Sequence, residues 1–269
     1  MRIQDKSWTT FANNRIQKSQ STITKTLEKL SGGDKIIRAS NNSSGLSVSE
    51  TLRAQIRGLG RAQENMQNGL SVLETTDSGL QSVNSTLIRA RELAIQAAND
   101  TFTTEDRESA QQELTQLMES INDTSKNLEF NTQKILGEIR PLYIQIGSNT
   151  GQSLTIDTVD ISTKKLGIED TSLTSHDEAN SLISKIDNAV EYVTKNLVKI
   201  GAQYNSLIHH NENVGNTNEN LQKSESLIRD PDIAIEMMDY VKQGIVSKGN
   251  ELLIQNVIRN TDSILKLIN

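Results

Sequence analysis

Apolar residues recur every seven positions along two long segments of the chain, one in each half. Such a repeat keeps one face of a helix turned toward a partner helix over many turns, and it is typical of coiled coils. The first segment carries it at Leu52, Leu59, Met66, Leu73, Leu80 and Leu87, and the second at Ile186, Val193, Ile200, Leu207, Val214 and Leu221. We therefore predict a mainly α fold, a long antiparallel coiled-coil helical rod with a small β-hairpin region in the middle.

Capping patterns set the predicted limits of the rod helices. Two S/T-x-x-E patterns, which place a side-chain cap at the start of a helix, occur at residues 47–50 and 175–178. A shorter helix begins after Thr103 or Thr104, before two acidic residues that suit the positive end of the helix dipole. We predict helices over residues 47–99, 104–129 and 176–224, with the second folding back on the first.

The period of the apolar residues changes from seven to two between residues 137 and 162. Leu142, Ile144 and Ile146 occupy alternate positions, and Leu154 and Ile156 do the same after a glycine-containing turn. Strict alternation on both sides of a turn predicts two paired strands. We therefore predict a β-hairpin region over residues 137–162.

Residues 1–40 and 230–269 are predicted to form terminal helices, outside a helical rod domain of residues 41–229. In the first segment, Ile16, Ile23, Leu27 and Leu30 share one helix face. The second segment opens at Asp230-Pro231, which is a strong start signal for a helix. Its apolar residues lie on more than one side, among them Ile233, Met237, Val241, Ile245 and Leu252. A single helix cannot bury such a surface alone, so we expect partners from the same chain or from other chains.

Two features of the polar residues leave alternatives open. Asn211 and Asn218 occupy heptad positions, where a buried asparagine fixes the register at some cost in stability; alternatively, the seam opens to solvent there. Residues 1–61 hold 11 Lys/Arg against 4 Asp/Glu, although the whole chain has a net charge of −6. That basic end is either a solvated helix face or a surface that packs on acidic residues of the same or a neighbouring chain.

The composition excludes several classes of function. The chain has no cysteine, which excludes disulfides, thiolate metal sites and thiol nucleophiles. Its negative charge argues against a nucleic-acid partner, and no apolar run is long enough for membrane insertion. The first 30 residues lack the apolar stretch of a secretory signal, so we expect any export to proceed without a cleaved signal peptide. We find no metal-binding histidine pattern, phosphate loop or nucleophile elbow, and predict no enzymatic activity, no cofactor and no metal site.

Several segments resemble bacterial flagellin, and they occur in the same order along the chain. They are the opening MRI, KLSGGDKIIRASNNSSGLSVSETLRAQIRGLGRAQENMQNGLSVLETT (29–76), IRARELAIQAANDT (88–101), LEFNTQKIL (128–136), IQIGSNTGQSLTI (144–156) and GNTNENLQKSESLIRDPDIAIEMMDYVKQGIVSK (215–248). The resemblance covers both ends and most of the length between them. It implies a minimal flagellin without the large variable outer domains of many members.

The resemblance implies a structural subunit that self-assembles into the helical tube of the flagellar filament for motility. Residues 1–40 and 230–269 would then pair as the filament-core domain. The implied partners are further copies of the chain, flagellar junction and cap proteins, and an export chaperone. The implied location is an extracellular flagellum, reached through type III export.

Two alternatives to a filament subunit remain at this point. The first residues and the last residues depart from the Asn-rich start and Ala/Gln-rich end usual in flagellins. This departure favours, as an alternative, a hook–filament junction or accessory flagellar protein. An intracellular coiled-coil scaffold is the generic alternative, although it is expected to have a longer heptad run and no hairpin.

One segment also resembles the stretch by which many flagellins are sensed by a Toll-like receptor of animals. Arg89, Leu93 and Gln96 are spaced to lie on one helix face, and Glu113 matches the family position on the returning helix. The resemblance therefore implies receptor recognition by these four residues. The alternative is that the same positions serve only contacts within the filament.

Overall fold

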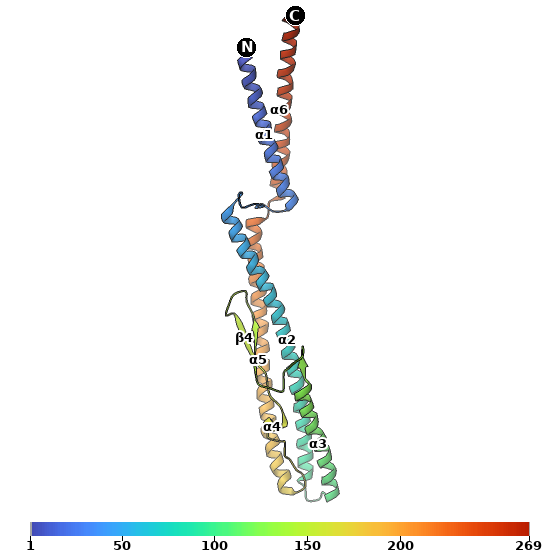
Figure 1. The fold of residues 1–269 in the computed structure, drawn as a ribbon. Coiled ribbons are helices and arrows are strands. Elements are labelled where there is room, and N and C mark those ends of the chain that lie inside the picture. Colours follow the sequence, from blue (N-terminus) through green and yellow to red (C-terminus); the bar gives the residue numbers. More distant parts are fainter. Residues whose placement is uncertain (1, 269) are drawn as a thin grey trace. The chain divides into compact units, whose positions relative to one another are not determined.

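The computed structural model describes the backbone of residues 2–268 and the side chains of residues 7–259, and it is mainly α-helical (Figure 1). The helices are α1 (Arg2–Gly32), α2 (Ser43–Ala97), α3 (Thr104–Asn127), α4 (Thr163–Leu166), α5 (His176–Arg229) and α6 (Ile233–Ile268). The strands are β1 (Glu129–Phe130), β2 (Gln133–Lys134), β3 (Pro141–Gln145) and β4 (Ser153–Asp157). The predicted fold class, long helices with a small hairpin between them, is confirmed.

The chain divides into two compact units, which we describe separately. Unit 1 consists of Met1–Ala54 and Asn220–Asn269, and unit 2 consists of Gln55–Glu219. Unit 1 therefore holds α1, α6, the first turns of α2 and the last turns of α5. The assignment of residues 1–40 and 230–269 to a filament-core domain stays a prediction.

The core of unit 2 is the seam predicted from the heptad repeats. The stripe residues from Leu59 to Leu87 and from Ile186 to Leu207 are buried, and α3 adds apolar side chains at Ala110, Leu114, Met118 and Ile121. Arg91 Nε lies 2.7 Å from the Asp187 carboxylate, and Tyr204 Oη donates to Glu74 at 3.0 Å. Because residue 74 of α2 pairs with 204 and residue 91 with 187, the two long helices run antiparallel.

The seam of unit 2 loosens toward its asparagines. Val214 is only half-buried, and Asn211 and Asn218 are also partly exposed. The side-chain oxygens of both asparagines are nevertheless shielded from solvent, and each lacks a hydrogen-bond partner among the described residues. The seam therefore opens toward solvent here while it still encloses polar atoms, and the role of the asparagines in fixing the register stays a prediction.

The start of α2 differs from the sequence prediction. The helix begins at Ser43 rather than Ser47, and the Asn42 side chain accepts a hydrogen bond from the Gly45 N–H at 2.9 Å. Asn42 is therefore the cap, and Ser47 lies inside the helix, where it accepts a bond from Thr51. The predicted capping pair of Ser47 and Glu50 is wrong, because the Glu50 carboxylate is engaged by Arg229 instead.

The start of α6 differs in a similar way. The Asp232 carboxylate accepts hydrogen bonds from the Ala234 and Ile235 N–H groups at 3.0 and 3.2 Å. The cap is therefore Asp232 and not Asp230, whose carboxylate accepts a bond from Ser226 instead. The helix begins at Ile233, after Pro231 rather than with it.

The caps of α3 and α5 follow the prediction. Thr103 and Asp106 form a reciprocal capping box, and Ser175 accepts a hydrogen bond from the Glu178 N–H at 3.3 Å. The helix ends differ from the predicted ones. Helices α2 and α3 stop at Ala97 and Asn127, before the predicted residues 99 and 129, whereas α5 continues past residue 224 to Arg229. The earlier end of α3 leaves room for the short β1–β2 pair, which was not predicted.

The predicted hairpin is formed by β3 and β4, which pair antiparallel from Pro141 opposite Asp157 to Gln145 opposite Ser153. Its apolar residues pack on the core of unit 2, and the side of α2 beneath it carries glycines at 58 and 69. A Cβ atom added at Gly58 would lie 2.8 Å from Ser148 Cβ and 3.3 Å from Ser148 Cα, in the hairpin turn. Gly58 therefore allows the turn to approach the helix backbone closely.

Substituting alanine at two nearby glycines of α2 is expected to have opposite effects. A Cβ at Gly60 would meet no atom within 4 Å. Gly60→Ala should therefore raise the free energy of unfolding by about 1 kcal/mol through helix propensity. Gly58→Ala should instead lower the free energy of unfolding and displace the hairpin turn, since the added Cβ would lie 2.8 Å from Ser148 Cβ and 3.3 Å from Ser148 Cα. Urea denaturation and amide exchange at residues 146–152 measure both effects, and equal stabilisation by the two variants would contradict the assignment.

The β1–β2 turn holds a residue in an unfavourable conformation. Asn131 and Thr132 are the two non-glycine residues with positive φ in the described backbone, at 49° and 64°. Two consecutive residues of this kind form the turn expected between antiparallel strands, but it favours Asn-Gly over a β-branched residue.

Thr132→Gly is therefore expected to raise the free energy of unfolding by about 0.5–1 kcal/mol, because the steric cost exceeds the added chain entropy. Thermal unfolding measures this gain. Thr150→Gly, at a turn position without positive φ, is the control and should be neutral or destabilising.

Candidate functional site

The candidate site is a pair of surfaces on α1 and α6, which pack together in unit 1. Lys29 Nζ lies 2.6 Å from Glu236 Oε1, so the end of α1 is beside the start of α6. Toward the chain ends, Ala12 of α1 and Ile254 of α6 line the same cleft. The helices therefore run antiparallel, as Figure 1 shows, with both chain ends at the same end of the pair.

Small and polar residues dominate the seam between these helices. The inward row of α1 consists of Thr9, Ala12, Ile16, Ser19, Ile23, Thr26 and Leu30, and that of α6 consists of Glu236, Tyr240, Gln243, Ser247, Asn250, Ile254 and Val257. Both rows keep the alternating three- and four-residue spacing of a coiled coil. Within residues 233–259, every side chain outside the α6 row is exposed. The pair is therefore a coiled coil with a weakly apolar seam.

Large apolar side chains lie on the outside of the same pair. On α6, the exposed residues include Ile233, Ile235, Met237, Met238, Val241, Ile245, Leu252, Leu253 and Ile258. On α1, Trp8, Phe11 and Leu27 are exposed. We call these twelve residues the outer apolar face. All five residues predicted for assembly on α6 belong to it.

The four residues predicted for assembly on α1 divide between the two surfaces. Leu27 belongs to the outer apolar face, whereas Ile16, Ile23 and Leu30 are half-buried in the seam. Their shared spacing on the helix was predicted, but three of them face α6 of the same chain. Trp8 and Phe11, at the start of α1, are the larger outward side chains.

The aromatic end of α1 forms one wall of a cleft of about 250 Å³. Trp8 and Phe11 meet edge to face with their ring centroids 6.4 Å apart, and the Arg15 guanidinium lies 5.4 Å from the Phe11 centroid. Asn250 lies in the opposite wall at 7% exposure, and its side-chain nitrogen has no hydrogen-bond partner among the described residues.

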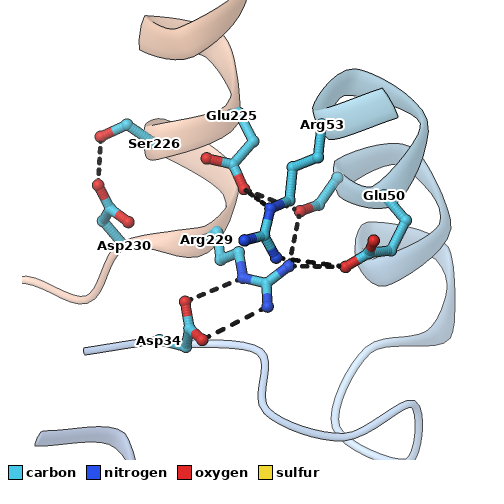
Figure 2. A network of polar contacts seen from close by, with 8 residues as sticks. Asp34, Glu50, Arg53, Glu225, Ser226, Arg229 and Asp230 are labelled. Atoms are coloured by element: carbon cyan, nitrogen blue, oxygen red, sulfur yellow. Dashed lines mark hydrogen bonds and ion pairs between the residues drawn. The ribbon is translucent and has the colours of Figure 1, made fainter. Parts of the chain in front are cut away.

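A network of charged side chains lies at the other end of unit 1 (Figure 2). Arg229, the last residue of α5, donates two hydrogen bonds to the Asp34 carboxylate at 2.9 and 3.4 Å. It also donates to Glu50 at 2.9 Å and to the Ser49 hydroxyl at 3.4 Å. The carboxylates of Asp34 and then Glu50 raise the pKa of the Arg229 guanidinium above its ordinary value, so the group stays charged.

Some basic residues of the N-terminal part of the chain pack on acidic residues, and others lie on a solvated helix face. Lys29 and Arg53 lie close to Glu236 and Glu225, which belong to the acidic C-terminal part of the same chain. Arg61, by contrast, lies on the surface and pairs with Glu64 along its own helix. Both predicted uses of the basic residues therefore occur.

The four residues predicted for receptor recognition are close together in unit 2, but one of them is buried. Arg89 donates to Glu113 on α3 at 2.9 Å and to Glu92 at 3.1 Å. Gln96 is exposed, whereas Leu93 is 3% exposed and belongs to the core. Leu93 therefore packs beneath the surface, and Arg89, Gln96 and Glu113 form it.

No other arrangement in the described part of the chain suggests chemistry. No three metal-binding side chains come together among the residues that the structure describes. His176 is hydrogen-bonded to the Ala98 carbonyl and to Asn180. None of the described helices has the length and apolar character required to cross a membrane.

The comparisons with known proteins agree along almost the whole chain. Residues 4–140 match the family described as the bacterial flagellin N-terminal helical region, and residues 183–268 match the bacterial flagellin C-terminal helical region. Flagellin of Halalkalibacterium halodurans is 36% identical over 247 residues, which cover 91% of each chain. The flagellar filament 30.7 kDa core protein of Treponema maltophilum is 33% identical, with 96% of each chain covered.

Solved structures show the same similarity. The crystal structure of Bacillus cereus flagellin matches 56% of this chain and 88% of its own, with a TM-score of 0.52 and 30% identity. A putative flagellar hook-associated protein from Vibrio parahaemolyticus matches 70% of this chain and 99% of its own, with a TM-score of 0.58. At 16% identity, the second match shows a shared fold only.

Proposed function

The chain belongs to the bacterial flagellin family and is a structural subunit of the flagellar filament, and from this premise we propose that it polymerises through the outer apolar face of α1 and α6. Residues 1–40 and 230–269 act in this proposal as the filament-core domain. Neighbouring copies cover the apolar side chains that the single chain leaves in water.

One observation carries the proposal: the terminal pair buries small and polar residues in its seam and leaves many of its large apolar residues exposed. Ser19 and Thr26 are buried in its seam, whereas Ile245 is 68% exposed. Burying a large aliphatic side chain stabilises an assembly by about 1.5–3 kcal/mol. The twelve residues of the outer apolar face therefore supply a much larger driving force for association than the polar seam supplies for pairing within one chain.

The same surface supports further partners of the proposed subunit. Before assembly, Met237, Met238, Val241 and Ile245 lie along one exposed stretch of α6, where an export chaperone can cover them. At the ends of a filament, junction and cap proteins take the place of the missing neighbour. We further propose an extracellular location, which the chain's membership of a flagellar filament family supports.

Seeded polymerisation of the full chain tests the proposal. Purified protein is mixed with short filament seeds or ammonium sulfate, and negative-stain electron microscopy follows the products. We expect long tubes of uniform diameter. A persistent monomer, under conditions that polymerise another flagellin, would refute self-assembly and favour a junction or accessory protein.

A second proposed function, recognition by an animal Toll-like receptor, is favoured by the surface around Arg89. Arg89 and Glu113 bridge α2 and α3 at the surface, and Gln96, Ile88 and Ile95 are exposed beside them. The patch therefore combines charged and apolar groups on a rigid base. Receptor-reporter cells should respond to the monomer and lose the response with Arg89→Ala, but not with Arg61→Ala, which removes a similar surface ion pair. No response to the unmodified monomer would refute this function.

A further inference from the structure

Arg229 lies where the two connectors to the terminal helices meet. Residues 33–42 connect α1 to α2, and residues 230–232 connect α5 to α6. The Arg229 carbonyl accepts a hydrogen bond from the Lys35 N–H at 2.6 Å, and its side chain binds Asp34. Arg229 thus joins the end of α5 to the connector of residues 33–42, which follows α1.

The first turns of α2 complete the arrangement, as Figure 2 shows. Glu50 and Ser49 accept the remaining hydrogen bonds of the Arg229 guanidinium, and Ser49 is fully buried. Ser49 in turn donates to Glu225 at 3.2 Å, and Arg53 lies between Glu50 and Glu225. Two arginines and three carboxylates therefore hold three segments of the chain in one geometry.

The chemistry of this site requires a guanidinium. Arg229 uses one planar group to bind Asp34 with two nitrogens and Glu50 with a third contact. A lysine ammonium is a point charge with three donors and cannot reproduce this fork. The Arg229 side chain is only 15% exposed, so these contacts set its position.

We propose that Arg229 is a positioning residue for filament assembly, which holds the connector of residues 33–42 against the end of α5 so that α1 and α6 start from fixed points. The proposal rests on the proposed function, because it concerns how the outer apolar face of that function is presented. A rigid base is needed here, since the small and polar seam between α1 and α6 restrains their alignment weakly.

The ion pairs of Arg229 are expected to position the connector without contributing much to the free energy of unfolding. Asp34 and Glu50 are 35% and 50% exposed, and ion pairs with such solvent access contribute little to overall stability. The large apolar core of unit 2 lies outside the network. Loss of Arg229 should therefore loosen the connector and leave the folded helices in place.

Arg229→Gln and Arg229→Lys in the full chain test the proposal, with Arg61→Gln as the matched control. Arg61 is also an arginine paired with a glutamate on α2, but its side chain is 80% exposed. We expect Arg229→Gln to raise amide exchange within residues 33–42 and to slow seeded filament growth, each by about tenfold or more, and to change the filament waveform. Arg229→Lys should give a smaller change, and Arg61→Gln none. The thermal unfolding midpoint by circular dichroism should stay near that of the unmodified chain.

Asp34→Asn provides a second variant that keeps Arg229 and its bond to Glu50. It should slow growth less than Arg229→Gln, and the double variant should grow no more slowly than Arg229→Gln alone, because both changes remove the same contact. Additive losses, or a global drop in the unfolding midpoint with Arg229→Gln, would overturn the positioning role. So would growth, waveform and exchange equal to those of the unmodified chain.

The outcome can be told apart from a failure of the proposed function. If variants of the outer apolar face also polymerise normally, the proposed assembly surface is wrong. If those variants fail to polymerise while Arg229→Gln grows normally, only the role of Arg229 is wrong.

Discussion

Replacing Val241 and Ile245 together by aspartate is expected to abolish filament growth. The two side chains are 52% and 68% exposed, so the charges remain hydrated in the monomer and cost little there. In the proposed filament they are covered by a neighbour, where an unpaired carboxylate costs several kcal/mol. Two such groups should lower the rate of seeded growth by at least about a hundredfold. Light scattering and electron microscopy of seeded reactions measure the change.

Asn256→Asp is the control for this variant. Asn256 is an exposed polar residue of the same helix, and the substitution adds negative charge without removing an apolar group. We expect it to polymerise at nearly the normal rate. Normal filaments from Val241→Asp/Ile245→Asp would contradict the assembly surface, and failure of Asn256→Asp would assign the effect to charge alone. Circular dichroism of both monomers confirms that the helices remain folded.

The long helices could be predicted because their signal is local and repeated. Leu73, Leu80 and Leu87 are each fully buried, as the seven-residue period requires. Many large apolar side chains at a constant spacing outweigh the uncertainty of any single position. The same reasoning predicted the hairpin, in which Leu142 pairs with Ile156 and Ile144 with Leu154.

The helix starts were harder to predict, because several residues can serve as caps within a few positions. Residues 230–232 contain two aspartates around a proline, and only the backbone geometry selects Asp232. Ser47 and Glu50 match a capping pattern, yet Asn42 lies close enough to the Gly45 N–H to start the helix earlier. In both cases the local sequence allowed more than one start, and the local backbone geometry decided between them.

The pairing of α1 with α6 could be predicted from the sequence only in part, for a different reason. The large apolar residues of the sequence indicate the outer apolar face but not the seam, where Ser19 and Ser247 occupy inward positions. The signal that was present is the shared spacing of small residues from Ala12 to Thr26. Arg229 and Asp34 are separated by 195 positions, so no local pattern indicates their contact. Long-range ionic contacts of this kind follow from the fold and not from short motifs.

Leu80→Ala is expected to cause the largest loss of stability. Leu80 is fully buried in the seam of unit 2, in one core with residues of α3, α5 and the hairpin. Removing three carbon atoms there leaves a cavity that close-packed neighbours fill only in part. Leucine-to-alanine changes of this type cost about 3–5 kcal/mol, a large share of the stability of a domain. Urea denaturation followed by circular dichroism measures the loss.

Val198→Ala is the matched control, because Val198 lies on α5 at 70% exposure and its replacement should change the free energy of unfolding by less than about 0.5 kcal/mol.

Leu80 belongs to unit 2, whereas the outer apolar face belongs to unit 1, so the effects on stability and on filament growth should be separable. Well below its unfolding temperature, Leu80→Ala should still extend seeds, although it unfolds at lower urea. Val241→Asp/Ile245→Asp should show the reverse, with nearly normal stability and no growth. A loss below about 1 kcal/mol for Leu80→Ala would contradict the close-packed seam on which the description of unit 2 depends.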